Sequence, residues 1–186
     1  MTLSIHRYGD PVLRQSAVPV PAVTPEIRAL VEEMIRVMHQ ANGVGLAAQQ
    51  VGRTEAVCVV DVPVDYDQDD EGLRLNPDIP MPFALLNPEI VSVSKKTATL
   101  DEGCLSFPGI SGGVKRPWSI AVRHLGLDGK PRETELKGYV ARAVQHEIDH
   151  LRGVLFIDHF THVKRLAVHN RLRRLQEKTR AALPDA

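Results

Sequence analysis

The sequence predicts an α+β fold in which the strands are clustered between helices. Strand-like runs occupy residues 55–62, 83–93, 96–100, 119–125 and 131–137, the last two forming a hairpin that turns near Asp128-Gly129. Helical patterns precede and follow these runs without alternating with them, which argues against a doubly wound sheet. The chain has no linker or shift in composition, so we expect residues 1–186 to form one domain.

The first helix is expected to begin after Thr24. A threonine hydroxyl can cap a helix N-terminus, and Pro25 suits the first turn because that turn needs no N–H from it. Apolar residues then recur at helical spacing and form one face: Ile27, Leu30, Val31, Met34, Met38 and Ala41.

A later helix carries the most informative motif, His146-Glu147-Ile148-Asp149-His150. An apolar stripe places this motif on a buried helix that Gly153 ends: Val140, Val144, Ile148 and Leu151. Residues four apart share a helix face, so the two imidazoles can bind one metal ion. Glu147 can then take a proton from metal-bound water, which indicates a hydrolase.

A hydrolytic metal site needs a third protein ligand, and its identity separates the enzyme classes. The extended pattern of one protease class requires a histidine where this chain has Phe156. Another class uses a downstream glutamate, and the only one is Glu177, in a strongly basic stretch. An HExxH metallopeptidase therefore remains the second hypothesis, without support from either pattern.

Two upstream segments complete a larger pattern. Gly43-Val44-Gly45-Leu46-Ala47-Ala48-Gln49-Gln50 follows the first helix, and Glu102-Gly103-Cys104-Leu105-Ser106 follows a strand-like run. With the histidine motif, in this order and at about these separations, they resemble the three defining motifs of peptide deformylases. These enzymes remove the formyl group from the N-terminal methionine of new polypeptides. The resemblance runs from the segment His6–Arg14 to the final helix.

The resemblance implies antiparallel sheets packed around the central metal-binding helix, and it implies roles for individual residues. The metal ligands would be Cys104, His146 and His150, with water as the fourth ligand. Glu147 would be the general acid and base. The Gln50 side-chain amide and the Leu105 backbone N–H would bind the formyl oxygen, where each such donor commonly contributes about 3 kcal/mol.

The glycine segment and the metal each leave alternatives open. The resemblance implies that Gly43 and Gly45 pair with the substrate backbone and that Val44 is a wall of the methionine pocket, although the glycines can also simply end a helix and open a turn. The resemblance implies one Fe²⁺ per chain, whereas the ligand set by itself also accommodates Zn²⁺, Ni²⁺ or Co²⁺.

The chain departs from the family pattern at two places. An arginine that often follows the cysteine motif is absent, and Ser111 is its nearest substitute. Residues 63–82 look like an acidic insertion, which we expect to be an exposed loop and not a metal site. Arg116 does match a recurrent family arginine and is expected to pair with Glu102, orienting the loop that carries Cys104.

The final helix, residues 161–181, is strongly basic. Its cations are Lys164, Arg165, Arg171, Arg173, Arg174, Lys178 and Arg180. Such a run can be only a solvated face, but the resemblance implies docking on ribosomal RNA, where nascent formyl-methionyl polypeptides emerge. A catalytically silent ribosome-binding protein is therefore the third hypothesis.

Composition limits the remaining possibilities. The chain has 23 basic and 23 acidic residues, so no general electrostatic partner such as DNA is expected. Cys58 lies in an apolar run and is expected in the core, which leaves Cys104 free as a thiolate. No signal-like or membrane-spanning stretch is apparent, and a reducing cytoplasm is the expected setting.

Overall fold

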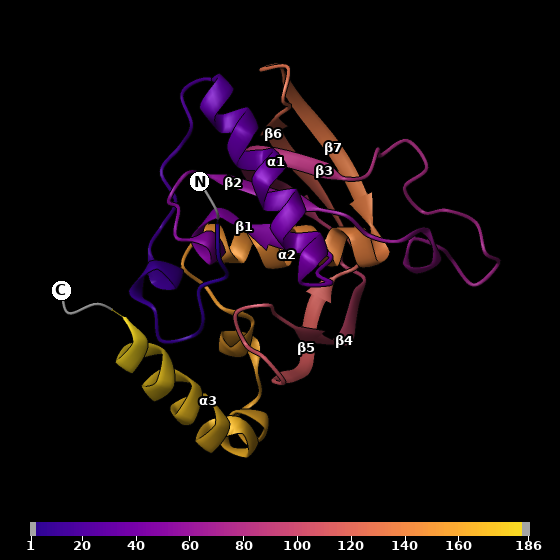
Figure 1. The fold of residues 1–186 in the computed structure, drawn as a ribbon. Helices are drawn as coiled ribbons and strands as arrows, with labels where there is room; N and C mark the ends of the chain where they lie inside the picture. Colours follow the sequence, from indigo (N-terminus) through magenta and orange to yellow (C-terminus); the bar gives the residue numbers. More distant parts are fainter. Residues whose placement is uncertain (1–2, 184–186) are drawn as a thin grey trace.

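The computed structural model describes residues 3–183 and has three helices and two sheets (Figure 1). The helices are α1 (Pro25–Gln40), α2 (Gly138–Leu151) and α3 (His162–Ala182). The strands are β1 (Gly45–Ala47), β2 (Val57–Val60), β3 (Phe83–Val93), β4 (Thr97–Gly103), β5 (Ser111–Pro117), β6 (Ser119–Leu125) and β7 (Pro131–Lys137). The larger sheet has the order β1-β2-β3-β6-β7, the smaller one pairs β4 with β5, and every pairing is antiparallel. The predicted α+β class is confirmed.

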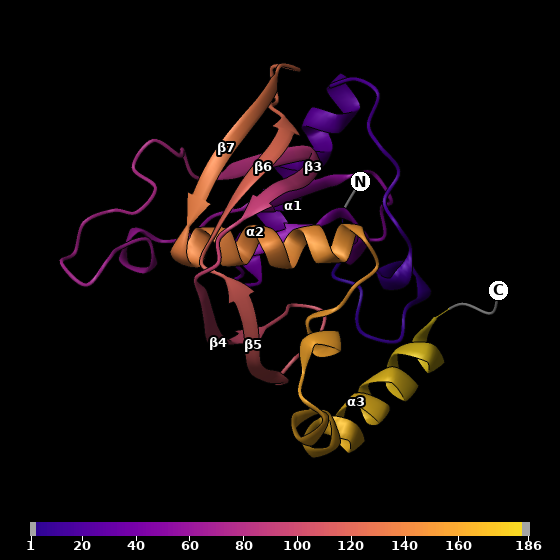
Figure 2. The ribbon, with the colours of Figure 1, turned by 180° about the vertical axis from the view of Figure 1, so that it is seen from behind.

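The larger sheet lies between α1 and α2, which cover opposite faces of it (Figures 1 and 2). Every residue of strand β2 is buried. Successive side chains of a strand point to opposite faces of the sheet, and each face is covered by a helix. Cys58 and Val60 belong to the apolar cluster of α2, whereas Val57 and Val59 belong to that of α1. The expectation that Cys58 lies in the core is therefore confirmed.

The predicted start of α1 and the predicted end of α2 follow from local chemistry. The Thr24 hydroxyl accepts a hydrogen bond from the Ile27 N–H, and α1 ends one residue before Ala41, which caps it instead of extending the apolar face. Helix α2 ends at Leu151, and Gly153 takes the left-handed conformation with φ 71°.

The β4–β5 hairpin lies on the other side of α2 from the larger sheet, so α2 passes through the middle of the molecule (Figures 1 and 2). Strand β5 was not among the expected strands. Its first half, Ser111-Gly112-Gly113, has low strand propensity, and only pairing with β4 makes it extended. Strand β1 escaped notice for the same reason, since it begins at Gly45 and has only three residues.

Residues 63–82 protrude beside the N-terminal end of α2 (Figure 1). Most of this segment is exposed, as expected, but two of its polar side chains are buried. The Asp67 carboxylate accepts hydrogen bonds from Arg74 and Asn76, and Asn76 bonds both the N–H and the carbonyl of Lys137. These hydrogen bonds therefore attach the loop to the end of β7.

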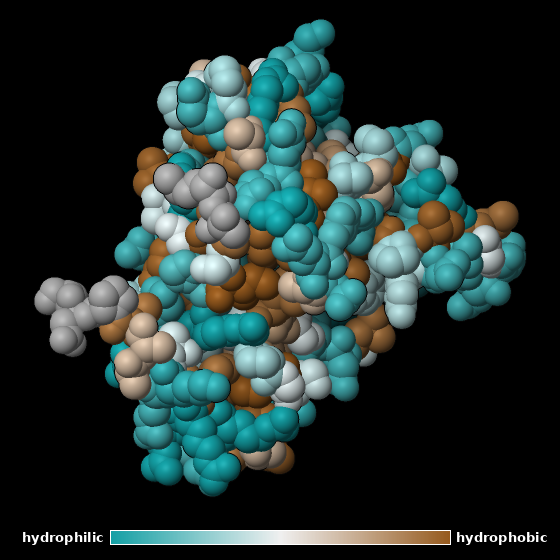
Figure 3. Space-filling view, in the orientation of Figure 1, coloured by the Kyte–Doolittle hydropathy of each residue, from teal (hydrophilic) through white to brown (hydrophobic). Residues whose placement is uncertain are grey.

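Helix α3 packs at the edge of the molecule through a narrow apolar seam. Val168 and Leu172 are its buried residues and join a cluster with Phe156 and Phe160. The face of α3 that Figure 3 shows is mostly hydrophilic, although Val163 and Leu166 at the start of the helix are exposed. Among the described helices, none is both long and apolar enough to cross a membrane.

Candidate metal centre and active site

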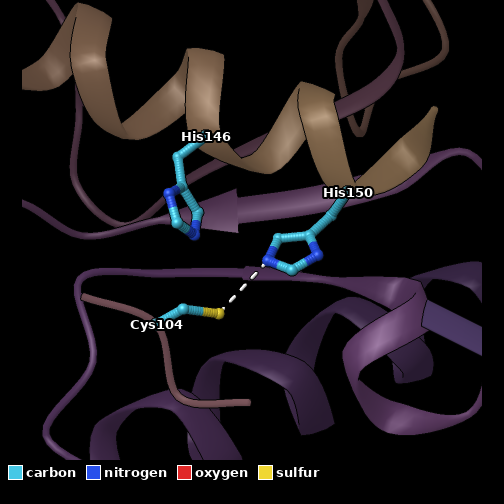
Figure 4. Close-up of side chains that lie close together, drawn as sticks. All are labelled: Cys104, His146 and His150. Atoms are coloured by element: carbon cyan, nitrogen blue, oxygen red, sulfur yellow. Dashed lines mark hydrogen bonds between the residues drawn. The ribbon is translucent and has the colours of Figure 1, made fainter. Parts of the chain in front are cut away.

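Three side chains from α2 and from the segment that follows β4 point toward one another (Figure 4). His146 and His150 project from the same face of α2, and Cys104 follows directly after β4. One donor atom from each residue lies within 4.8 Å of the others, and the Cys104 Sγ is 3.3 Å from the His150 Nε2. A thiolate with two imidazoles suits a transition metal and leaves a coordination position open, so these residues fit a catalytic ion.

The carboxylate of Glu102 lies directly behind this group. It is 3.0 Å from the His146 Nδ1 and accepts hydrogen bonds from the guanidinium groups of Arg116 and Arg142. Burial alone would raise the pKa of Glu102, but the hydrogen bonds from His146 and Arg116 outweigh it and lower that pKa to about 2. The negative charge of Glu102 therefore holds the His146 ring in orientation.

The expected pairing of Arg116 with Glu102 is confirmed, and two partners were missed. Arg116 also donates to the Asp149 carboxylate at 2.8 Å, and Arg142 donates to the carbonyls of Val114 and Ala98. Arg142 lies one helical turn before His146 on the buried face of α2. A buried arginine at that spacing was the available signal, because such a charge needs a partner.

Glu147 lines the same pocket, whose volume is about 360 Å³. Its side chain is buried, and its Oε2 makes no hydrogen bond to any described group of the protein. Desolvation raises the pKa of Glu147 to about 7, against the opposing effect of a positive charge on His146. A carboxyl group with a pKa near neutrality can both accept and release a proton during a reaction.

Gln50 is buried beside Cys104. Its Oε1 accepts a hydrogen bond from the Ala47 N–H at 2.8 Å, so its Nε2 is the atom that faces the site. This nitrogen lies 3.3 Å from the Cys104 Sγ and 3.4 Å from the Ser106 Oγ. The amide group is thereby held in one orientation.

The three residues of the glycine segment, Gly43, Val44 and Gly45, all line the pocket, as does Leu105. A Cβ at Gly43 would lie 2.6 Å from the Leu105 Cδ1. A Cβ at Gly45 would lie 2.9 Å from the Glu147 Cδ and closer still to its Oε1. The glycine at position 45 is thus required for the approach of Glu147, a reason that the sequence did not reveal.

Ser111 and the arginines of α3, to which the sequence also drew attention, lie outside this group. Ser111 begins β5 opposite Gly103 and is exposed, so it faces an adjoining cavity and not the metal ligands. The arginines of α3 are exposed, and none of them lines the pocket.

Comparison with known proteins identifies close relatives. The family model described as polypeptide deformylase matches residues 2–166. The chain is 41% identical to a peptide deformylase of Opitutus terrae, over 98% of this chain and 97% of the relative. It is 44% identical to one of Hydrogenovibrio crunogenus, over 88% of each chain.

Solved structures agree with these matches. A crystal structure of peptide deformylase from Ehrlichia chaffeensis has a TM-score of 0.83 and 36% identity, covering 97% of this chain and 99% of that one. A second structure of the Ehrlichia enzyme, in complex with actinonin, has a TM-score of 0.80 and 35% identity, with 93% and 96% coverage. These matches lend no support to the alternative of an HExxH metallopeptidase.

Proposed function

This chain belongs to the polypeptide deformylase family, and on that premise we propose how its own residues remove the formyl group from nascent formyl-methionyl polypeptides. The observation that carries the proposal is the convergence of Cys104, His146 and His150 in one pocket with Glu147. We assign residues 1–186 to one catalytic domain that acts in the cytoplasm.

Cys104, His146 and His150 would hold one divalent ion, for which we propose Fe²⁺, with Zn²⁺, Ni²⁺ or Co²⁺ as substitutes. The bound ion supplies Lewis acidity and makes water a competent nucleophile near neutral pH. Glu102 supports this role because its carboxylate fixes the ring of His146 from behind.

Glu147 is the proposed carrier of the proton. Its carboxylate takes the proton from the attacking water and delivers it to the amine that leaves when the formyl C–N bond breaks. The pKa of about 7 supports this assignment, since neither the charged nor the neutral form is strongly preferred near neutral pH.

Gln50 and Leu105 are the proposed donors to the formyl oxygen. Attack on the formyl carbon places negative charge on that oxygen, and donors aimed at it stabilise the transition state. The Gln50 Nε2 is directed into the site because its Oε1 is held by the Ala47 N–H. The backbone N–H of Leu105 is the second donor, on the residue directly after Cys104.

The segment Gly43-Val44-Gly45 is proposed to bind the substrate. Its residues line the pocket together with Cys104 and Leu105, and Gly45 begins β1, an edge strand of the larger sheet. A peptide can add to this short edge strand through backbone hydrogen bonds, with the methionine side chain against Val44.

Release of formate from a short formyl-methionyl peptide tests the proposal. The protein is purified without oxygen, and its metal content is measured in the same sample. We expect wild type to release formate and Glu147→Gln, which keeps the shape but cannot carry the proton, to release at least 100-fold less. Equal rates for the two proteins would overturn the role of Glu147, and no release by a folded, metal-loaded wild type would overturn the function.

We also propose that α3 docks the enzyme on ribosomal RNA. Its arginines are exposed, and none of them lines the pocket. Phosphate contacts make such binding sensitive to salt. Reversing the charges of Arg171, Arg173 and Arg174 should abolish co-sedimentation with ribosomes at low salt while formate release from the free peptide persists. Unchanged co-sedimentation would refute the docking.

A further inference from the structure

The residue after the cysteine ligand lies in a tight turn. The Phe107 N–H donates to the Cys104 carbonyl at 2.9 Å, so Leu105 and Ser106 are the two central residues of a β-turn. The carbonyls of these two residues accept no hydrogen bond within that turn. A turn held by one internal bond needs outside partners to keep its peptide planes fixed.

Those partners come from the N-terminal segment His6–Tyr8, which we call the clamp. The Arg7 guanidinium donates to the Leu105 carbonyl, and the Tyr8 N–H donates to the Ser106 carbonyl at 2.9 Å. The Tyr8 ring also stacks on Phe107, with ring centroids 4.9 Å apart. Both central carbonyls of the turn are therefore bonded to the clamp.

The clamp also reaches the other proposed donor. The His6 N–H donates to the backbone carbonyl of Gln50 at 2.8 Å. Two consecutive residues, His6 and Arg7, thus bond the backbones of Gln50 and Leu105, which are separated by more than fifty positions in the chain. The clamp is itself held, because the Asp10 carboxylate accepts from the Val12 N–H and lies 2.6 Å from the His6 Nδ1.

We propose that Arg7 is a positioning residue for the deformylation reaction, acting through the Leu105 peptide. The inference rests on the proposed function of Leu105. The Leu105 N–H lies in the peptide plane between Cys104 and Leu105, whose carbonyl, that of Cys104, accepts from the Phe107 N–H and so closes the turn. The Leu105 carbonyl, which Arg7 bonds, lies in the next peptide plane of the same turn. Without Arg7 that second plane is freed and the turn loosens, so the Leu105 N–H can shift away from the position that the oxyanion takes. Such donors act only when they lie at about 2.7–3.1 Å from that oxygen.

The exposure of Arg7 makes the test practicable, because its removal leaves the core intact. Steady-state kinetics are measured for Arg7→Ala, Arg7→Lys and the control Arg14→Ala. Arg14 is matched to Arg7, since it is an exposed arginine of the same N-terminal region that donates to a backbone carbonyl, that of Gly153. It lies outside the pocket.

We expect Arg7→Ala to lower kcat about tenfold, less than the ~100-fold or greater loss when an oxyanion donor is deleted outright. KM should change less than about twofold, since the donor acts in the transition state. Arg7→Lys, which keeps one donor, should recover most of kcat, and Arg14→Ala should match wild type. An Arg7→Ala kcat equal to that of Arg14→Ala, or a loss that appears only in KM, would overturn the proposal.

Hydrogen exchange separates this failure from failure of the proposed function. The amide of Phe107 closes the turn, and its exchange should accelerate in Arg7→Ala but not in Arg14→Ala, whether or not the protein releases formate. Accelerated exchange with no formate release from wild type would refute the function and leave the clamp standing. Unchanged exchange with an active wild type would refute the clamp alone.

Discussion

Replacing Gly45 by alanine should disable the enzyme through Glu147. The added Cβ would lie 2.9 Å from the Glu147 Cδ and 3.1 Å from its Cγ, whereas ordinary contacts begin at 3.4 Å. The Cδ must therefore retreat by about 0.5 Å, and the carboxylate oxygen by more. Glu147 is buried and has little space to move. Because a misplacement of about 1 Å commonly costs ~100-fold in rate, we expect kcat/KM to fall about 30- to 100-fold.

Formate release from a formyl-methionyl peptide, with metal content measured in parallel, provides the assay. Gly113→Ala is the matched control, because its Cβ would lie at an ordinary 3.4 Å from Thr99 on the hairpin outside the pocket. The decisive variant is the double mutant with Glu147→Gln. If Gly45 acts through Glu147, alanine at position 45 adds little to the loss already caused by Glu147→Gln.

Two results would refute this reasoning. A Gly45→Ala protein with wild-type kcat/KM would show that Glu147 has room to spare. Fully additive losses in the double mutant would show that the glycine serves the substrate backbone instead, as the family resemblance implies, and not the carboxylate.

Three further predictions concern Glu102, His124 and the metal ligands. Glu102→Gln leaves the buried guanidinium of Arg142 without an anionic partner and that of Arg116 with Asp149 alone. It should therefore lower the free energy of unfolding in urea by about 3 kcal/mol and weaken metal binding at least tenfold, and an unchanged urea midpoint would contradict this. Burial lowers the pKa of His124 below 6.5, so the unfolded chain binds more protons as the pH falls through 6.5. Unfolding free energy should therefore drop more between pH 7.5 and 5 in wild type than in His124→Gln, and equal drops would exclude the effect. Chelation should stop formate release, and added Fe²⁺ should restore it in wild type but not in Cys104→Ala; activity that survives complete metal removal would rule out the ligand set.

Much of the fold was predictable because the relevant signals are local. The α1 cap at Thr24, the strand 83–93 and the hairpin after residue 118 each follow from short patterns that tertiary contacts did not override. Strands β1 and β5 were not predictable in this way, since their glycines oppose strand formation and only their neighbours in the sheets make them extended.

In the candidate site, too, the features with a local sequence signal were predicted and those that depend on long-range contacts were not. The metal-ligand motif on α2 is visible because His146 and His150 are one helical turn apart, and Cys104 entered through the resemblance. Arg142 and Arg7 were missed because each meets its partner across a long separation in the chain: 40 positions to Glu102, and 98 to Leu105. No local pattern records which backbone carbonyl or carboxylate a distant arginine will reach.

The charges around the proposed metal ligands explain why two arginines are buried here. Arg116 and Arg142 bring two positive charges, and Glu102 and Asp149 bring two negative ones, so this outer group is neutral. The Cys104 thiolate then contributes the one uncompensated negative charge among the ligands, because imidazole ligands are neutral. A divalent ion held by this set retains about one unit of positive charge to oppose an oxyanion. Removing either arginine would leave an extra negative charge next to His146 and reduce that attraction, even with every ligand in place.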